Sequence, residues 1–105
     1  MPYRVILSRT AKRDLRETEE WLAERDLTTL RRWQLRFRVS VSQLSEDPTV
    51  FPEADEAAEF GVDLRMLAFG KRPHVYKVLS TISGSDVNIA CVRHAARDSL
   101  SEDDL

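Results

Sequence analysis

Apolar residues along the chain recur with two different periods, and the change of period predicts the order of the elements. The first run, YRVIL at 3–7, is short and rich in β-branched and aromatic residues, which favours a strand. The segment 10–26 instead places mostly apolar residues four, three and four positions apart between Ala11 and Leu22. This spacing brings them to one face of a helix. A strand followed by an amphipathic helix is therefore expected.

A second amphipathic helix follows almost directly. Between Leu30 and Leu44 its apolar residues recur three, four, four and three positions apart, and Pro48 ends the run. Because the link between the helices is short, they are expected to form an antiparallel hairpin. Hydroxyl side chains ahead of each helix can accept hydrogen bonds from N–H groups of the first turn. The candidate caps are Ser8 or Thr10 for the first helix and Thr28 or Thr29 for the second.

An acidic connector separates the helices from three further strand-like runs. The connector, residues 47–62, has Pro52 and Gly61 at positions that allow one or two helical turns between them. The runs after it are again short and rich in β-branched residues. They lie at 64–69, 74–82 and 87–92. The sequence SGSD between the last two predicts a tight hairpin, in which Gly84 supplies the positive φ.

The order strand, helix, helix, strand, strand, strand predicts an α+β domain of two layers. The last three strands are close enough in sequence to form an antiparallel meander, and with the N-terminal strand they make a mainly antiparallel four-stranded sheet. The helical hairpin is expected to bury its apolar stripe on one face of that sheet and to leave the other face free for a partner. The chain of 105 residues is expected to form a single domain, 1–105, whose acidic tail at 98–105 is frayed.

Charge is segregated along the chain, although the net charge is only −2. Residues 47–63 contain six acidic and no basic residues, and residues 98–105 contain four acidic and no basic residues. The opposite holds for residues 64–97, with six basic residues against one acidic residue. The body of the protein is therefore basic, and it is expected to face an anionic partner.

Several classes of protein are excluded by residue usage. The only cysteine, Cys91, allows no intrachain disulfide, which suits a reducing compartment. No run approaches the ~18 apolar residues of a membrane span, and the N-terminal apolar run is too short for a signal peptide. Two histidines and one cysteine without ligand spacing predict neither a metal site nor a cofactor. We expect a cytoplasmic protein that does not contact a membrane.

Basic residues gather in the sheet half of the chain. Because adjacent strands lie about 4.8 Å apart, residues distant in sequence can converge on one face, and a crowded cationic site suits a phosphate. Side chains alternate between the two faces of a strand, however, and this places Arg65 on the same face as Leu67. Ordinary surface charge is therefore the other interpretation of these basic residues. The candidate general acid or base is His94. The set comprises Arg65, Lys71, Arg72, Lys77, Arg93 and Arg97, with His74 and His94.

Four features, taken in order, resemble a known family. They are the opening YRVILSRTAKRDLRETEEWL, a second amphipathic helix that ends in L…P, the central LRMLAFGKRPHVYKVL and the closing VNIACVRHAARD. All four are similar to features of the RelE/ParE superfamily, the toxins of bacterial type II toxin–antitoxin modules. The resemblance covers roughly residues 3–98. It implies the same strand and helix order as the periodicity does.

The resemblance also implies partners. A toxin of this family is neutralised by an antitoxin whose C-terminal segment wraps it in a hetero-oligomer, and such modules cause growth arrest and plasmid stabilisation. ParE-like members inhibit DNA gyrase, whereas RelE-like members are ribosome-dependent mRNA endoribonucleases. Antitoxin or target binding is expected at basic residues of the sheet half and one aromatic residue. These are Arg65, Lys71, Arg72, Tyr76, Arg93 and Arg97.

For a nuclease, the resemblance implies four residues that hold and polarise the scissile phosphate. They are Arg65, Lys77, Arg93 and His94. This chain departs from the nuclease pattern at Leu67 and Ala95, where basic residues are usual, and no aromatic residue follows Tyr76 to stack on a base. We therefore expect a ParE-like inhibitor of gyrase, with a RelE-like endoribonuclease as the alternative, so whether the chain is an enzyme stays open.

Overall fold

The computed structural model describes residues 2–95, so the predicted acidic tail and Arg97 lie outside the described residues. The predicted order of strands and helices is confirmed. Between Pro52 and Gly61, where one or two helical turns were expected, the connector forms one short helix, and a 3₁₀ turn that was not predicted precedes Pro52. The elements are β1 (Arg4–Leu7), α1 (Arg9–Arg25), α2 (Leu27–Glu46), the 3₁₀ turn η1 (Pro48–Val50), α3 (Ala57–Phe60), β2 (Arg65–Phe69), β3 (Tyr76–Ser83) and β4 (Asp86–His94).

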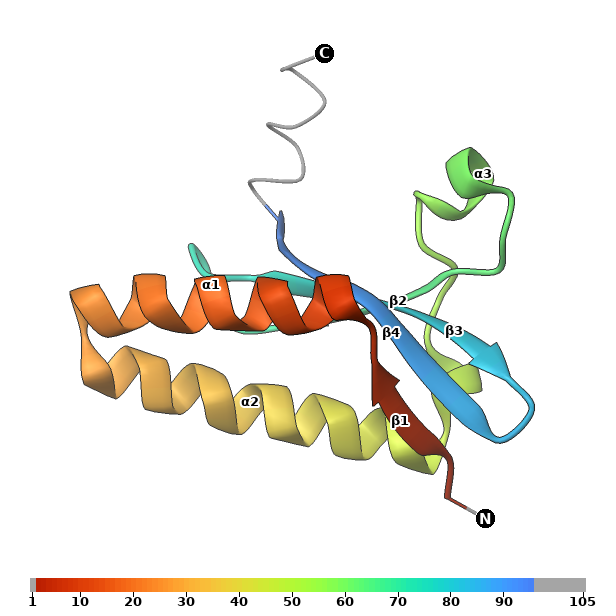
Figure 1. Ribbon diagram of the computed structural model, residues 1–105, viewed down its shortest axis with the longest axis horizontal. Coiled ribbons are helices and arrows are strands. Elements are labelled where there is room, and N and C mark those ends of the chain that lie inside the picture. Colours follow the sequence, from red (N-terminus) through yellow and green to blue (C-terminus); the bar gives the residue numbers. More distant parts are fainter. Residues whose placement is uncertain (1, 96–105) are drawn as a thin grey trace.

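The four strands form one mixed sheet in the order β1-β4-β3-β2. The pairs β2–β3 and β3–β4 are antiparallel, which confirms the predicted meander, and Gly84 has a φ of 60° in the hairpin between β3 and β4. The pair β1–β4 is parallel. Helices α1 and α2 lie side by side against one face of this sheet (Figure 1).

An extra residue, Ala90, interrupts the pairing of β4 with β3. Its carbonyl oxygen accepts a hydrogen bond from Ser8 Oγ at 2.7 Å, and the N–H of Val92 donates to the Asp14 carboxylate at 3.0 Å. Strand β1 ends at Leu7, so it does not reach this part of β4. The first two turns of α1 therefore satisfy backbone groups of β4 that would otherwise lack a neighbouring strand.

The helix caps follow the predictions only in part. Ser8 caps α1, because its Oγ accepts the N–H of Ala11 at 3.0 Å, as expected. The prediction of a threonine cap for α2 is wrong, since Asp26 holds that position. Its carboxylate accepts the N–H of Thr28 at 3.1 Å and the hydroxyl of Thr29 at 2.8 Å. Among residues 2–95 neither helix is long and apolar enough to cross a membrane.

The main core lies between the helices and the sheet. Trp33 of α2 is only 4% exposed, and its ring centroid lies 5.9 Å from that of Phe37, 5.5 Å from Phe69 and 5.3 Å from Tyr76. Valine and isoleucine residues of β3 and β4 complete this layer with no exposed surface. Burial of each large apolar side chain contributes about 1.5–3 kcal/mol, so this layer is the main source of stability.

The opposite face of the sheet is partly covered by the connector, which corrects the expectation that this face is free. Ala54 and Ala57 of the connector, together with Leu64 just after it, pack against Leu79 and Cys91 of the sheet. A backbone hydrogen bond of 2.8 Å from the Ala54 N–H to the Leu64 carbonyl closes this segment into a loop. Because the connector is recognisable in the sequence mainly by its acidity, its small buried alanines did not indicate a second layer.

Candidate functional site

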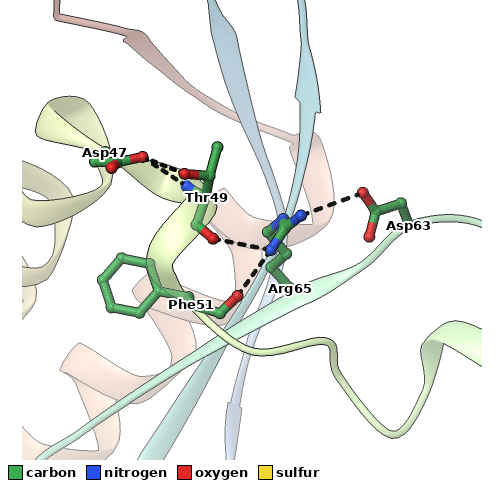
Figure 2. Close-up of polar contacts among 5 residues, drawn as sticks. All are labelled: Asp47, Thr49, Phe51, Asp63 and Arg65. Carbon is green, nitrogen blue, oxygen red and sulfur yellow. Dashed lines mark hydrogen bonds and ion pairs between the residues drawn. The ribbon is translucent and has the colours of Figure 1, made fainter.

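Arg65, the first candidate residue, holds the connector in place (Figure 2). Its Nη1 donates to the carbonyl oxygens of Thr49 at 3.1 Å and Phe51 at 2.9 Å, and its Nη2 lies 3.8 Å from the Asp63 carboxylate. The side chain is 26% exposed. Alternation along β2 places it on the helix side of the sheet together with Leu67. The guanidinium is thus engaged in folding contacts.

The carbonyl groups that Arg65 binds belong to a turn with its own cap. The Asp47 carboxylate accepts the hydroxyl of Thr49 at 2.6 Å and its N–H at 3.0 Å (Figure 2). These two hydrogen bonds lower the pKa of Asp47. The turn is therefore held by its own hydrogen bonds as well as by those of the Arg65 guanidinium.

Lys77 leaves the sheet on the opposite face. It follows the buried Tyr76 and precedes the fully buried Val78, both of which face the helices. Its Nζ lies 3.0 Å from Glu56 Oε2, and the two side chains are 18% and 11% exposed. Glu56 Oε1 has no hydrogen-bond partner among the described residues. An anionic ligand could reach Lys77 only by displacing the Glu56 carboxylate.

Arg93 shares this face, because it is the cross-strand partner of Lys77 and such partners point to the same side. It is exposed, and its charge acts on the buried Cys91 two residues earlier. Burial raises the pKa of the Cys91 thiol, and nearby Arg93 opposes that shift only in part. A buried thiol with a raised pKa is disfavoured as a nucleophile, because the thiolate is the reactive form.

His94 belongs to a cluster of rings at the end of β4. Its ring centroid lies 5.0 Å from that of its cross-strand partner Tyr76 and 6.3 Å from that of His74. The His74 ring in turn lies 6.0 Å from Trp21 of α1, which is 36% exposed and has the Arg25 guanidinium 4.0 Å above its ring. Trp21 was not among the candidate site residues. Trp21 lies beside the apolar stripe of the first helix and outside its three- and four-residue spacing, and this feature of the sequence could have identified it.

The remaining basic candidates lie on the loop between β2 and β3. The N–H of His74 donates to the Lys71 carbonyl at 2.7 Å, which closes a tight turn and leaves Lys71 and Arg72 exposed. Tyr76, expected to contact a partner, is only 4% exposed and belongs to the core. Of the expected binding residues, Lys71, Arg72 and Arg93 therefore lie at the surface within the described part of the chain.

The structure divides the four residues expected for a nuclease among three places. Arg65 holds the connector from the helix side, Lys77 and Arg93 lie on the opposite face, and His94 joins the ring cluster. Phosphoryl transfer requires such groups to surround one phosphate. This arrangement does not place all four around one position.

Residues 2–95 offer few features for binding a metal ion or a small molecule. No group of three or more histidine, cysteine, aspartate or glutamate side chains is placed there to hold a metal ion. An open groove between α1 and α2 has a volume of about 150 Å³, with Trp33 and Phe37 in its lining. Ligand pockets usually measure about 300–1,000 Å³, so this groove is small for a substrate.

Comparison with known proteins does not assign the chain to a family. No family model matches it, and no curated protein is significantly similar to it. The arrangement of Arg65, Lys77 and His94 and the motifs quoted above are therefore the basis for a functional proposal.

Proposed function

We propose that this chain is the toxin of a type II toxin–antitoxin module, that its antitoxin neutralises it by direct binding, and that it acts as a ParE-like inhibitor of DNA gyrase. Two features support the proposal. The motif resemblance covers roughly residues 3–98, and the element order of the α+β domain agrees with the RelE/ParE-like fold that the resemblance implies. We propose both that the chain belongs to such a module and that its target is gyrase.

The separation of Arg65 from Lys77 is the observation that favours an inhibitor over a nuclease. Both residues are engaged within the fold, Arg65 by two carbonyl groups and Lys77 by the Glu56 carboxylate. An inhibitor that binds another protein needs no convergence of cations around one phosphate. It needs an accessible surface, and the exposed Lys71 and Arg72 supply charge that suits an acidic partner surface.

A supercoiling assay with purified gyrase and purified toxin tests the proposal. We expect inhibition that weakens in a Lys71→Ala, Arg72→Ala double variant. The matched control is Lys12→Ala, Arg13→Ala, which removes two exposed, adjacent cations from α1 instead. The proposal fails if excess toxin leaves supercoiling unchanged while ribosomes arrest in cells that express the chain.

The second candidate function is that of a RelE-like, ribosome-dependent mRNA endoribonuclease. The ring cluster favours it, because the ring centroids of His94 and His74 lie 6.3 Å apart and an imidazole can serve as a general acid or base. The message's own 2′-hydroxyl would attack the phosphate, with His94 as acid or base. Primer extension on translated messages tests this candidate. Either no cleavage in the ribosomal A site, or cleavage unchanged in His94→Ala, rejects it.

A further inference from the structure

The outer side of α2 presents a stripe of exposed residues, here called the α2 stripe. At its centre Leu35 is 61% exposed and Val39 is 51% exposed, although both are apolar. Their neighbours on this side follow the three- and four-residue spacing of a helix–helix seam. The stripe consists of Arg32, Leu35, Val39, Ser42 and Glu46, all of which are exposed. The opposite side of α2 carries the buried Trp33, Ser40 and Leu44.

Charge is distributed unevenly along α2. Its four arginines, Arg31, Arg32, Arg36 and Arg38, lie in the early and middle turns, whereas Glu46 and Asp47 lie at its C-terminal end. The last turn has no basic residue, and the first helical turn has no acidic residue. The dipole of a helix has its negative end at the C-terminus, so it favours basic residues in the last turn and acidic residues in the first turn. An antiparallel neighbour with the same sequence would bring its basic half to this acidic end.

We propose that the α2 stripe binds the α2 stripe of a second copy of this chain, with the two helices antiparallel. A two-fold axis through Val39 places Arg32 opposite Glu46 of the second copy, and symmetry creates this pair twice. The same axis packs the two Val39 side chains together and places Leu35 beside them. A parallel arrangement would instead put Arg32 against Arg32, so the charges select the antiparallel one.

A second copy fits the stripe because the stripe is complementary to itself. An acidic partner helix would satisfy Arg32 and leave Glu46 facing a like charge, and a basic one would do the reverse. One pair of helices buries less than the roughly 800 Å² per partner of stable interfaces, so the dimer forms in a concentration-dependent equilibrium. The proposal goes beyond the proposed function and holds whichever target the chain has.

Sedimentation velocity of the full chain over a range of concentrations tests the proposal. We expect a monomer–dimer equilibrium that high salt weakens, because its ion pairs are exposed. Val39→Lys introduces two cations at the axis and should raise the dissociation constant about tenfold or more. The matched control is Val62→Lys, since Val62 has almost the same exposure, 52%, and lies on the connector. The control should dimerise as the wild type does.

Charge reversal tests the antiparallel arrangement itself. Arg32→Glu should weaken the dimer, and Arg32→Glu combined with Glu46→Arg should restore it, because the pair is then re-formed in the opposite sense. Both positions are exposed, and circular dichroism will check that each variant is folded. The proposal is overturned if the wild type stays monomeric at every concentration, if Val39→Lys and Val62→Lys behave alike, or if the double reversal fails to recover the dimer.

Discussion

Arg65 and Lys77 lie on adjacent strands, three residues apart in register, and their side chains leave the sheet on opposite faces. Each contacts the segment that precedes β2. Arg65 binds it near η1 on the helix side (Figure 2), and Lys77 binds Glu56 on the other side. This segment therefore wraps around the edge of β2. Covering an edge strand in this way prevents it from pairing with other chains.

Removal of the Arg65 side chain should destabilise the fold. Arg65→Ala deletes two hydrogen bonds to carbonyl oxygens, and we expect a loss of about 1.5–3 kcal/mol in the free energy of unfolding. Arg65→Lys should recover little of it, because an ammonium lacks the planar fork of donors. Urea unfolding followed by circular dichroism measures the change. Arg72→Ala, at an exposed position, is the control and should change stability by less than about 0.5 kcal/mol. Equal losses in both variants would contradict a structural role for Arg65.

The Lys77–Glu56 pair should behave as a buried ion pair. Lys77→Met leaves the Glu56 carboxylate, which is 11% exposed, without its cation, and we expect a loss of about 3 kcal/mol. The double variant Lys77→Met, Glu56→Leu replaces both charges by apolar groups and should be close to wild type. Urea unfolding of both single variants and the double variant completes a double-mutant cycle. Additive losses would show that the two residues do not stabilise each other.

Periodicity predicted the elements because their signal is local. The spacing of apolar residues between Leu30 and Leu44 is set by the helix itself, and the position of Gly84 is set by its own turn. The connector could not be placed in this way. Its packing on Leu79 depends on Ala54, a small residue that forms no periodic apolar pattern in this acidic segment.

The faces of the sheet on which the candidate site residues lie were harder to predict, because β4 contains one extra residue at a bulge. Strict alternation along β4 would put Cys91 on the same face as Ile89. The bulge at Ala90 instead turns Cys91 towards the connector and Val92 towards the helices. The sides on which Arg93 and His94 project follow from that shift. No residue type in VNIACV indicates a bulge, so only the three-dimensional pairing reveals it.

Gly70 should not tolerate a side chain. Its φ is +100°, and a Cβ there would lie 2.3 Å from the carbonyl oxygen of His74. Gly70→Ala is therefore expected to destabilise the protein by about 3 kcal/mol or more, since strain and a backbone clash add. Gly84→Ala is the matched control, because φ is +60° there and no atom lies within 4 Å. It should lose only about 1–2 kcal/mol. Thermal unfolding of both variants measures the difference, and similar losses would contradict the clash.

The aspartate caps should make stability depend on pH in the acid range. Hydrogen bonds from the Thr29 hydroxyl and the Thr28 N–H lower the pKa of Asp26 from its usual 3.8, and the Thr49 hydroxyl and N–H do the same for Asp47. The folded state thus binds fewer protons than the unfolded state near this pH. The stabilisation is present above pH 3.8 and is lost as the pH falls through the lowered folded-state pKa.

Asparagine at both caps isolates this effect, because it accepts the same hydrogen bonds but carries no titrating charge. We expect Asp26→Asn, Asp47→Asn to unfold at a lower temperature than the wild type at pH 7, and the gap between them to close as the pH falls below 3.8 and through the lowered folded-state pKa values. Melting temperatures measured from pH 7 to pH 2 give the comparison. Glu20→Gln on the exposed side of α1 serves as a charge control and should leave the wild-type profile unchanged. A gap that stays constant over the whole range would mean that the two carboxylates do not carry the acid sensitivity.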